Sequence, residues 1–288
     1  MRVTINYDRV EELSNLLSLI EPSRILVLEE EFDPQFKALK KLSATVGRNW
    51  ASVYALLVSL VSYKLTMKGE EWWDCLASMI SRRRSLIPPT RLDDVLQDVL
   101  WFLDNCRGSI IARDAKRRRV QTVFKNAKHL LSMLASRPDI IYESAEDIIK
   151  SLSRALNVEP WRKTVVFTVK MVYYAVREPG DQRLLNIDIP IPVDVRVACA
   201  SYSSMVVEAP NYMEITRNPR PAQEAWSIIS KKTGIPTINL DTILWLTGWM
   251  PRDLSLDDVK ERVQRLLSRI VEDKRAFEIA RRLYLRKC

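Results

Sequence analysis

Two lysines and a phenylalanine stand at helical spacing in the segment WRKTVVFTVKM, residues 161–171. An α-helix advances about 100° per residue, so Lys163, Phe167 and Lys170 share one narrow stripe of its surface. A lysine amine that has lost its proton is a nucleophile and forms a Schiff base at an electrophilic carbon. Burial, together with a second ammonium on the same stripe, would favour that neutral form of Lys163. The other interpretation is that both lysines extend their head groups into water above apolar stems.

Asp194 is the acidic partner that such chemistry would need. It lies in the segment IPIPVDVRVACA, where Pro192 restricts the backbone just before an expected helix. A carboxylate at a helix start accepts backbone N–H groups and interacts favourably with the helix dipole. The simplest interpretation of Asp194 is therefore an N-cap. Beside a nucleophilic lysine, the same carboxylate could also stabilise a developing positive charge.

These residues must be positioned by helices, because apolar residues recur three and four apart along most of the chain and period-two alternation is almost absent. Proline-containing breaks are expected at 178–192 and 208–221. The sequence thus predicts an all-α protein with helices at 8–20, 34–46, 48–65, 70–83, 90–106, 115–135, 144–157, 163–177, 193–207, 221–232, 239–249 and 255–286.

The charge of the chain indicates a polyanionic partner. The 288 residues carry a formal charge of +9, with a pI near 9.4, which favours association with nucleic acid. A basic stretch begins at residue 113, and its side chains could neutralise backbone phosphates, although a solvated face of a basic helix would have the same composition. The DNA-backbone candidates in this stretch are Arg113, Lys116, Arg117, Arg118 and Arg119.

Several function classes lack the residues they need. Cys75, Cys106, Cys199 and Cys288 are widely separated and form no CxxC motif, so we expect no metal site and no cofactor. His129 is the single histidine, which leaves little for histidine-dependent catalysis. No long uncharged apolar run and no leader pattern occurs, so we expect a soluble, cytoplasmic protein with no membrane association. In that setting the cysteines are expected to be reduced thiols.

The segment RKTVVF, followed about thirty residues later by PVDVRVA, resembles the helix-hairpin-helix DNA glycosylase superfamily. Within it, the chain resembles the archaeal 8-oxoguanine DNA glycosylase family, known as AGOG. Further matching residues extend over much of the chain: Gln35 in DPQFKAL, Trp73 in EEWWDC, Phe167, Lys170, and the pair Asp241 and Trp245 in LDTILWLTGW.

The resemblance implies a helix-hairpin-helix (HhH-GPD type) fold of two helical lobes, with the active site in the cleft between them. We expect the 288 residues to form one glycosylase unit. One lobe would comprise about 1–65 plus 193–288, and the other about 66–192, with the hairpin near 155–165.

The resemblance also implies the activity: a bifunctional DNA glycosylase and AP lyase that excises 8-oxoguanine from DNA during base excision repair. Lys163 would attack the sugar and form the Schiff base, and Asp194 would support it. Arg162 would contact the DNA backbone. We expect a monomer acting on DNA that contains 8-oxoguanine. The base pocket would comprise Gln35, Trp73, Phe167, Lys170, Asp241 and Trp245.

The chain departs from the superfamily at the hairpin. The wider superfamily has a glycine-rich turn before the lysine, whereas this sequence has ALNVEPWRKT, without glycine. The four-cysteine cluster of the endonuclease III branch is also absent. Two alternatives remain: the same fold acting on another oxidised base, or a non-catalytic helical nucleic-acid-binding protein.

Overall fold

The computed structural model describes residues 2–248 and 253–288, and it confirms the expected all-α architecture. The chain forms two compact units. Unit 1 comprises Met1–Asp33 and Gln182–Cys288, and unit 2 comprises Pro34–Asp181.

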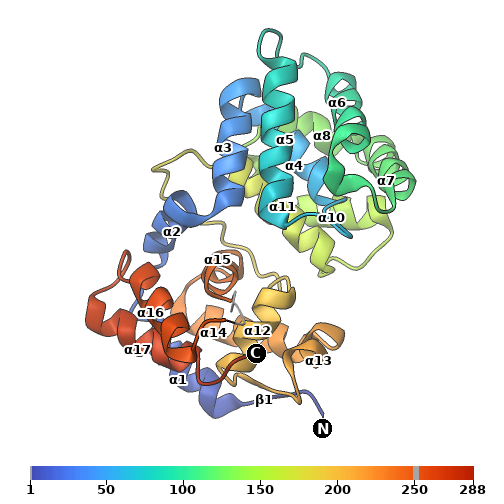
Figure 1. Cartoon of the computed structure of the whole chain (residues 1–288). Coiled ribbons are helices and arrows are strands. Elements are labelled where there is room, and N and C mark those ends of the chain that lie inside the picture. The colour runs from blue at the N-terminus through green and yellow to red at the C-terminus, as the bar shows by residue number, and fades with distance from the viewer. Residues whose placement is uncertain (1, 249–252) are drawn as a thin grey trace. The chain divides into compact units, whose positions relative to one another are not determined.

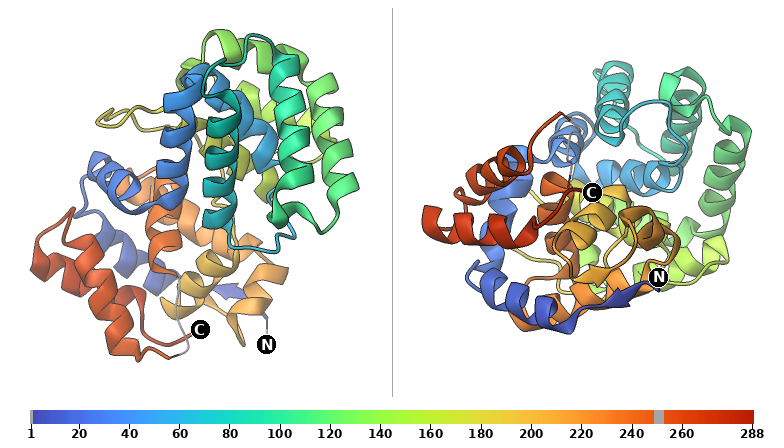
Figure 2. Two further views of the ribbon diagram at one scale, coloured as in Figure 1. Left: turned by 45° about the horizontal axis from the view of Figure 1, so that its top comes forward. Right: turned by 60° about the horizontal axis from the view of Figure 1, so that its bottom comes forward.

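Unit 2 is a bundle of helices around the apolar helix α11 (Figure 1). Helix α11 packs against α4 and α3, and α3 packs against α5 (Figure 2). The elements of unit 2 are α3 (Pro34–Val46), α4 (Arg48–Ser59), α5 (Gly69–Arg84), α6 (Leu92–Asn105), the 3₁₀ turn η2 (Arg107–Ser109), α7 (Arg113–Asn126), α8 (Lys128–Ser136), α9 (Ile140–Glu143), α10 (Ala145–Leu156) and α11 (Lys163–Val176).

Helix α11 is buried on every side from Thr168 onward, which explains its nearly continuous apolar sequence. Side chains of other helices of unit 2 contact its polar groups. The Ser59 hydroxyl donates to the Thr168 hydroxyl at 2.9 Å. At the end of the helix, the Lys40 ammonium donates to the carbonyls of Ala175 and Arg177 at 3.0 and 2.5 Å. Carbonyls at a helix C-terminus lack intrahelical donors, so Lys40 stabilises the end of α11.

Unit 1 joins the first residues of the chain to its last third. Helix α1 packs against α14 and α17 (Figure 2). The short strands β1 and β2 pair antiparallel. Its elements are β1 (Thr4–Ile5), α1 (Tyr7–Leu17), η1 (Pro22–Arg24), α2 (Ile25–Phe32), α12 (Val195–Ser203), β2 (Val207–Glu208), α13 (Tyr212–Arg217), α14 (Arg220–Thr233), α15 (Thr237–Thr247), α16 (Leu256–Leu267) and α17 (Asp273–Leu283).

The division differs from the expected lobe boundaries at both ends. Residues 34–65 were expected with the N-terminal lobe, but α3 and α4 pack against α5 and α11 and belong to unit 2. Residues 182–192 belong to unit 1, where Ile189 and Ile191 are buried and the Thr237 hydroxyl donates to the Ile189 carbonyl at 2.6 Å. Tertiary packing, which periodicity does not report, sets these limits.

Two of the expected long helices are each divided in two. The predicted helix 115–135 is α7 and α8, separated at Ala127, and the predicted helix 255–286 is α16 and α17. Neither break contains proline or glycine, and the helical spacing of apolar residues runs through both breaks. The sequence therefore contains no sign that these helices end. Helices α2 and α13 were not predicted. The predicted end of the helix 239–249 lies outside the described residues.

The expectation that all cysteines are reduced is wrong for one pair. A disulfide joins Cys199 on α12 to Cys288 at the C-terminus, across a sequence separation of 89 residues. The sequence could not reveal this pair, because the connectivity of a disulfide depends on which cysteines lie close together in the tertiary structure. Among the described helices, none combines the length and apolar character needed to span a bilayer.

Candidate active site

The hairpin between α10 and α11 reverses the chain at an asparagine, without glycine. Asn157 ends α10 in the left-handed conformation, with φ 52° and ψ 53°. Its N–H donates to the Arg154 carbonyl at 3.2 Å, and the Val158 N–H donates to the Ser153 carbonyl at 3.0 Å. This pair of bonds is a Schellman motif, and asparagine tolerates the left-handed conformation better than most residues. The glycine-free sequence therefore still forms a tight helical hairpin.

Lys163 is the first residue of α11, immediately after this hairpin. Its side chain is exposed, as is that of Arg162, the N-cap residue. Burial, which we expected to favour the neutral amine of Lys163, is therefore absent. The amino-terminal end of a helix carries partial positive charge, and a lysine there gains none of the stabilisation it would have at the other end. The exposed amine is accessible to a substrate.

Phe167 lies one turn along α11 and meets Trp73 of α5. Their ring centroids are 6.3 Å apart, with the planes tilted by 56°. Trp73 is buried, with 1% exposure, whereas Phe167 is half-buried. Gln35 is buried on α3, the helix that packs against both α5 and α11. Four candidates from distant parts of the sequence, Gln35, Trp73, Lys163 and Phe167, thus lie on three neighbouring helices of unit 2.

Lys170 continues the stripe but differs from Lys163 in its surroundings. It is 3% exposed, and its ammonium lies 5.3 Å from the centroid of the Tyr174 ring, one turn further along α11. A cation over an aromatic face is stabilised by the ring quadrupole. The alternative interpretation, that both lysines extend their head groups into water, is therefore wrong for Lys170, whose ammonium lies inside the protein.

Asp194 is the N-cap of α12, as the sequence predicted. Its Oδ1 accepts the Val197 N–H at 2.9 Å, and its backbone is extended, with φ −101° and ψ −171°. The side chain is half-buried. One carboxylate oxygen thus orients the group, and this cap leaves Oδ2 unused.

Trp245 is covered on one face by an arginine that sequence reasoning did not select. The Arg196 guanidinium carbon lies 3.9 Å from the Trp245 ring centroid, and its Nη1 donates to the Trp245 carbonyl at 3.4 Å. Gly248 permits this approach of α15 to α12, since an added Cβ would lie 2.4 Å from the Arg196 carbonyl oxygen. Asp241, one turn before Trp245, is buried with 4% exposure. Arg196 is the last residue of the PVDVR motif, two residues after Asp194. That position was the sequence signal from which Arg196 could have been chosen as a site residue.

The basic stretch on α7 is only partly available to a phosphate backbone. Lys116 is completely buried, and its ammonium lies 5.5 and 5.6 Å from the Tyr63 and Trp72 ring centroids. Burial lowers the pKa of Lys116. Its expected role as a backbone contact is therefore wrong, because it cannot reach a phosphate without leaving the core.

The arginines of α7 fall into different environments. Arg117 forms an ion pair with Asp104, and Arg119 lies 5.8 Å from the Tyr63 ring centroid. Arg113 is half-buried, with a buried Nε, and Arg118 is exposed. Arg118 is the residue of this stretch best exposed for a DNA phosphate.

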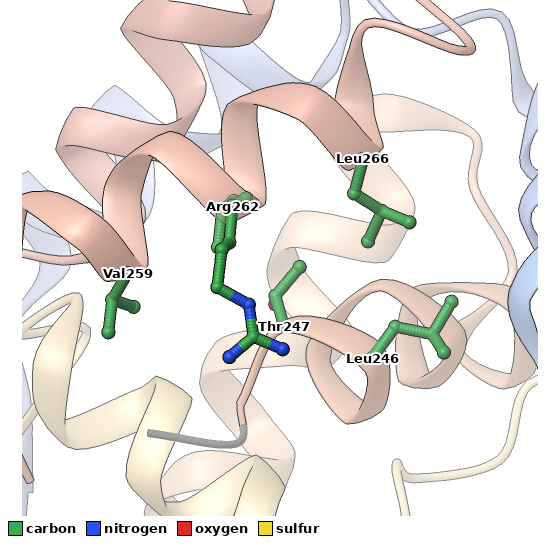
Figure 3. Close-up of a pocket in the computed structure, with 6 residues that line it drawn as sticks. Leu246, Thr247, Val259, Arg262 and Leu266 are labelled. Carbon is green, nitrogen blue, oxygen red and sulfur yellow. The ribbon is translucent and has the colours of Figure 1, made fainter. Parts of the chain in front are cut away.

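A small pocket of about 120 Å³ lies between α15 and α16 in unit 1 (Figure 3). Arg262 extends from α16 toward Thr247 at the end of α15. The described residues that line it are Leu246, Thr247, Val259, Arg262, Val263 and Leu266. The candidates Asp241 and Trp245 on the same helix are not among them, so this pocket is separate from the predicted base pocket.

Comparisons with known proteins identify the family of this chain. The sequence profile of the AGOG family, described as N-glycosylase/DNA lyase, matches residues 14–281. An N-glycosylase/DNA lyase of Aeropyrum pernix is 41% identical over 288 residues, which cover 100% of this chain and 99% of that protein. One from Pyrobaculum aerophilum is 31% identical over 241 residues, 82% of this chain and 86% of the relative.

A solved structure has the same fold over nearly the whole chain. It is the 8-oxoguanosine complex of Pa-AGOG, an 8-oxoguanine DNA glycosylase from Pyrobaculum aerophilum, with a TM-score of 0.72 and 25% sequence identity. The match covers 96% of this chain and 97% of the solved one. With the profile match over residues 14–281 and the relative at 41% identity, the chain belongs to the AGOG family of N-glycosylase/DNA lyases.

Proposed function

We propose that this protein excises 8-oxoguanine from DNA and then cleaves the strand, with Lys163 as the nucleophile. The observation that carries the proposal is the exposed Lys163 amine at the first position of α11, one turn from the Phe167–Trp73 ring pair. A flipped base needs flat walls beside the reacting sugar, and this arrangement provides an aromatic wall next to an amine. The 8-oxoguanosine bound by the solved relative supports the choice of base.

The proposed reaction proceeds by covalent catalysis. The neutral amine of Lys163 attacks C1′ of the flipped nucleotide, the bond from C1′ to the base breaks, and the base leaves with a proton. The sugar ring opens to an imine between C1′ and Lys163 Nζ. The imine acidifies C2′–H, so loss of that proton breaks the C3′–O bond and releases the 3′ phosphate. Water then hydrolyses the imine and regenerates the lysine.

Asp194 would act on the same nucleotide as an electrostatic group. A carboxylate beside a cationic sugar lowers the energy of the transition state, as it does in glycoside hydrolysis. The N-cap bond from the Val197 N–H holds Oδ1 in place, which leaves Oδ2 to face the positive charge or to accept the lysine proton. The proposal requires Lys163 of unit 2 and Asp194 of unit 1 to reach one sugar.

The base pocket would recognise the features that distinguish 8-oxoguanine from guanine, an N7–H donor and a C8 carbonyl. Asp194, Asp241 and the Gln35 amide oxygen are acceptors that could bind the N7–H. Phe167 and Trp245 would stack on the base, which contributes about 1–3 kcal/mol for an aromatic contact. Lys170 would orient the pocket or contact the base, and Arg162 would bind the backbone.

Borohydride trapping on a duplex that contains 8-oxoguanine tests the proposal. The native protein should form a covalent adduct, because borohydride reduces the imine to a stable amine. Lys163→Gln should form none while retaining DNA binding. If the native protein forms no adduct, or Lys163→Gln is still trapped, the assignment of Lys163 is wrong. Unchanged function in Lys163→Gln would instead favour the non-catalytic DNA-binding alternative.

The same assay separates the proposed substrate from another oxidised base. Duplexes with an oxidised pyrimidine, with guanine and with an abasic site should be compared under single-turnover conditions. Faster excision of the oxidised pyrimidine than of 8-oxoguanine would favour the alternative substrate. Trapping on the abasic site alone would indicate a lyase without the proposed glycosylase activity.

We also propose that the protein acts as a monomer in the cytoplasm. A single chain supplies both Lys163 and Asp194, so the reaction requires no second copy, and the proposed substrate is cellular DNA. Light scattering should give a mass near 33.4 kDa for the free protein.

A further inference from the structure

Two cysteines outside the proposed reaction lie against one another in unit 2. Cys75 is half-buried on α5, and Cys106 follows the end of α6 with 1% exposure. Their sulfur atoms are 2.8 Å apart. Non-bonded heavy atoms meet at about 3.5–4.0 Å, whereas a disulfide bond is about 2.0 Å long. The two sulfurs therefore need to approach by less than 1 Å to form a bond.

The surroundings of the pair favour a thiolate. The buried ammonium of Lys116 and the backbone N–H of Gly108 both act on Cys106. Together with the hydrogen bond from Cys75, which is the largest effect, they lower the pKa of Cys106 to about 7. The same bond raises the pKa of Cys75, so near neutral pH the pair shares one proton.

Dense packing holds the pair in place. The Met79 sulfur lies 3.5 Å from that of Cys75. A Cβ on Gly108 would lie 2.7 Å from the Trp72 ring, so this turn approaches α5 as closely as only glycine allows. The Cys106 thiolate is the negative group that acts on the charge of the buried Lys116.

We propose that Cys75 and Cys106 are a redox-active dithiol that closes to an intramolecular disulfide, with Cys75 as the accessible and Cys106 as the resolving cysteine. The oxidant is a small disulfide, R–S–S–R. As the Cys75 sulfur attacks one sulfur of the oxidant, its shared proton passes to Cys106, and the S–S bond breaks to give the mixed disulfide and one R–S⁻. That R–S⁻ takes the proton from Cys106, and the Cys106 thiolate attacks the Cys75 sulfur and releases the second R–S⁻. Two electrons pass from the cysteine pair to the oxidant, which leaves as one thiol and one thiolate.

The disulfide would join α5 to the end of α6 across a separation of 31 residues. Helix α5 also carries Trp73, two residues before Cys75, whose ring meets Phe167. Closing the bond therefore restrains the helix that supplies one wall of the proposed base pocket. This last consequence rests on the proposed function, whereas the thiol chemistry is independent of it.

Incubation of the folded full-length protein with glutathione disulfide, followed by alkylation under denaturing conditions and mass spectrometry, tests the proposal. The reduced Cys75–Cys106 pair should lose both alkylatable thiols without gaining glutathione, and a peptide map should link Cys75 to Cys106. Two thiols that remain, a stable glutathione adduct on the native protein, or dimers linked through these residues would overturn the proposal.

Two single variants distinguish the roles of the cysteines. Cys106→Ser should accumulate one glutathione on Cys75, because the resolving thiol is gone. Cys75→Ser should gain none, because Cys106 is buried. The reverse pattern would overturn the assignment of roles.

The pH dependence and the thermal stability provide readouts that do not involve DNA. Below pH 7 the rate of closure should rise about tenfold per pH unit, and it should level off above pH 7 as the pair loses its shared proton. Oxidised protein should melt about 5 °C or more above reduced protein, since a cross-link restricts the unfolded chain. The double variant Cys75→Ser, Cys106→Ser should show no such difference, and an equal shift in that variant would assign the effect to Cys199–Cys288 instead.

Discussion

At the scale of single residues, the two lysines of the α11 stripe have opposite environments. Lys163 is exposed at the helix start, and Lys170 is buried over Tyr174. An amine that attacks a sugar must be reached by DNA, whereas a buried cation keeps a fixed position and a strong local field. This difference in exposure agrees with the proposed roles of Lys163 as the nucleophile and Lys170 as a supporting charge.

Asp194 allows the cap and the proposed chemistry to be separated. Asparagine is as good an N-cap as aspartate, so Asp194→Asn should retain the Val197 bond and change the free energy of unfolding little. It removes the negative charge, so the single-turnover excision rate should fall about 100-fold or more while DNA binding is kept. Denaturant unfolding and single-turnover kinetics measure the two effects. An unchanged rate would leave Asp194 with the cap alone.

The exposures on α7 predict which cations bind phosphate. Arg118→Ala should reduce the slope of log K against log salt by about 0.9, the contribution of one neutralised phosphate. Lys116→Met should leave that slope unchanged, because Lys116 is buried. Binding titrations between low and moderate salt check both. A flatter slope in Lys116→Met with no change in Arg118→Ala would contradict the structural assignment.

At the scale of elements, the hairpin before α11 determines where Lys163 lies. The left-handed Asn157 ends α10, and the chain reaches Lys163 six residues later. A turn built this way depends on one backbone conformation and not on glycine as such. The hairpin therefore reverses the chain tightly although it contains no glycine.

Substitutions at Asn157 test this account. Asn157→Gly should be nearly neutral, because glycine adopts positive φ freely, although it also adds freedom to the unfolded chain. Asn157→Val should lower the free energy of unfolding by about 1–2 kcal/mol, because a β-branched residue is strained at φ 52°. Denaturant unfolding of both variants gives the comparison. Equal stability of the two would show that the left-handed residue is not required.

At the scale of the whole molecule, the chain has two compact units. Unit 1 contains a disulfide, and unit 2 contains a pair of thiols in hydrogen-bond contact. Cys199–Cys288 joins α12 to the C-terminus in unit 1, and the Cys75–Cys106 pair lies in unit 2. A cross-link acts chiefly on the unfolded state of the segment it closes. Each pair should therefore affect the unfolding of its own unit.

Removal of the Cys199–Cys288 disulfide tests this separation. Cys199→Ser with Cys288→Ser should lower the free energy of unfolding of unit 1 by about 2–4 kcal/mol. The protection of the amides of α11 in unit 2 should change much less. Hydrogen exchange resolved by peptide measures both units in one experiment. An equal loss of protection in both would show that the units unfold together.

The sequence by itself determined the helical class, the start of α11 at Lys163, the N-cap role of Asp194 and membership of the family. These features are local or carried by short motifs, because helical periodicity and capping depend on residues within a few positions of one another.

Only the tertiary structure decided which residues are buried and which meet. It placed Lys116 in the core, Arg196 over Trp245, Trp73 against Phe167, and α3 and α4 in unit 2. It also joined Arg83 and Arg84 of α5 to the fully buried Asp98. The physical reason is that charge and apolar period give a residue's chemistry, whereas solvent exposure and partners depend on segments distant in the chain. The disulfide between Cys199 and Cys288 depends on the same long-range proximity.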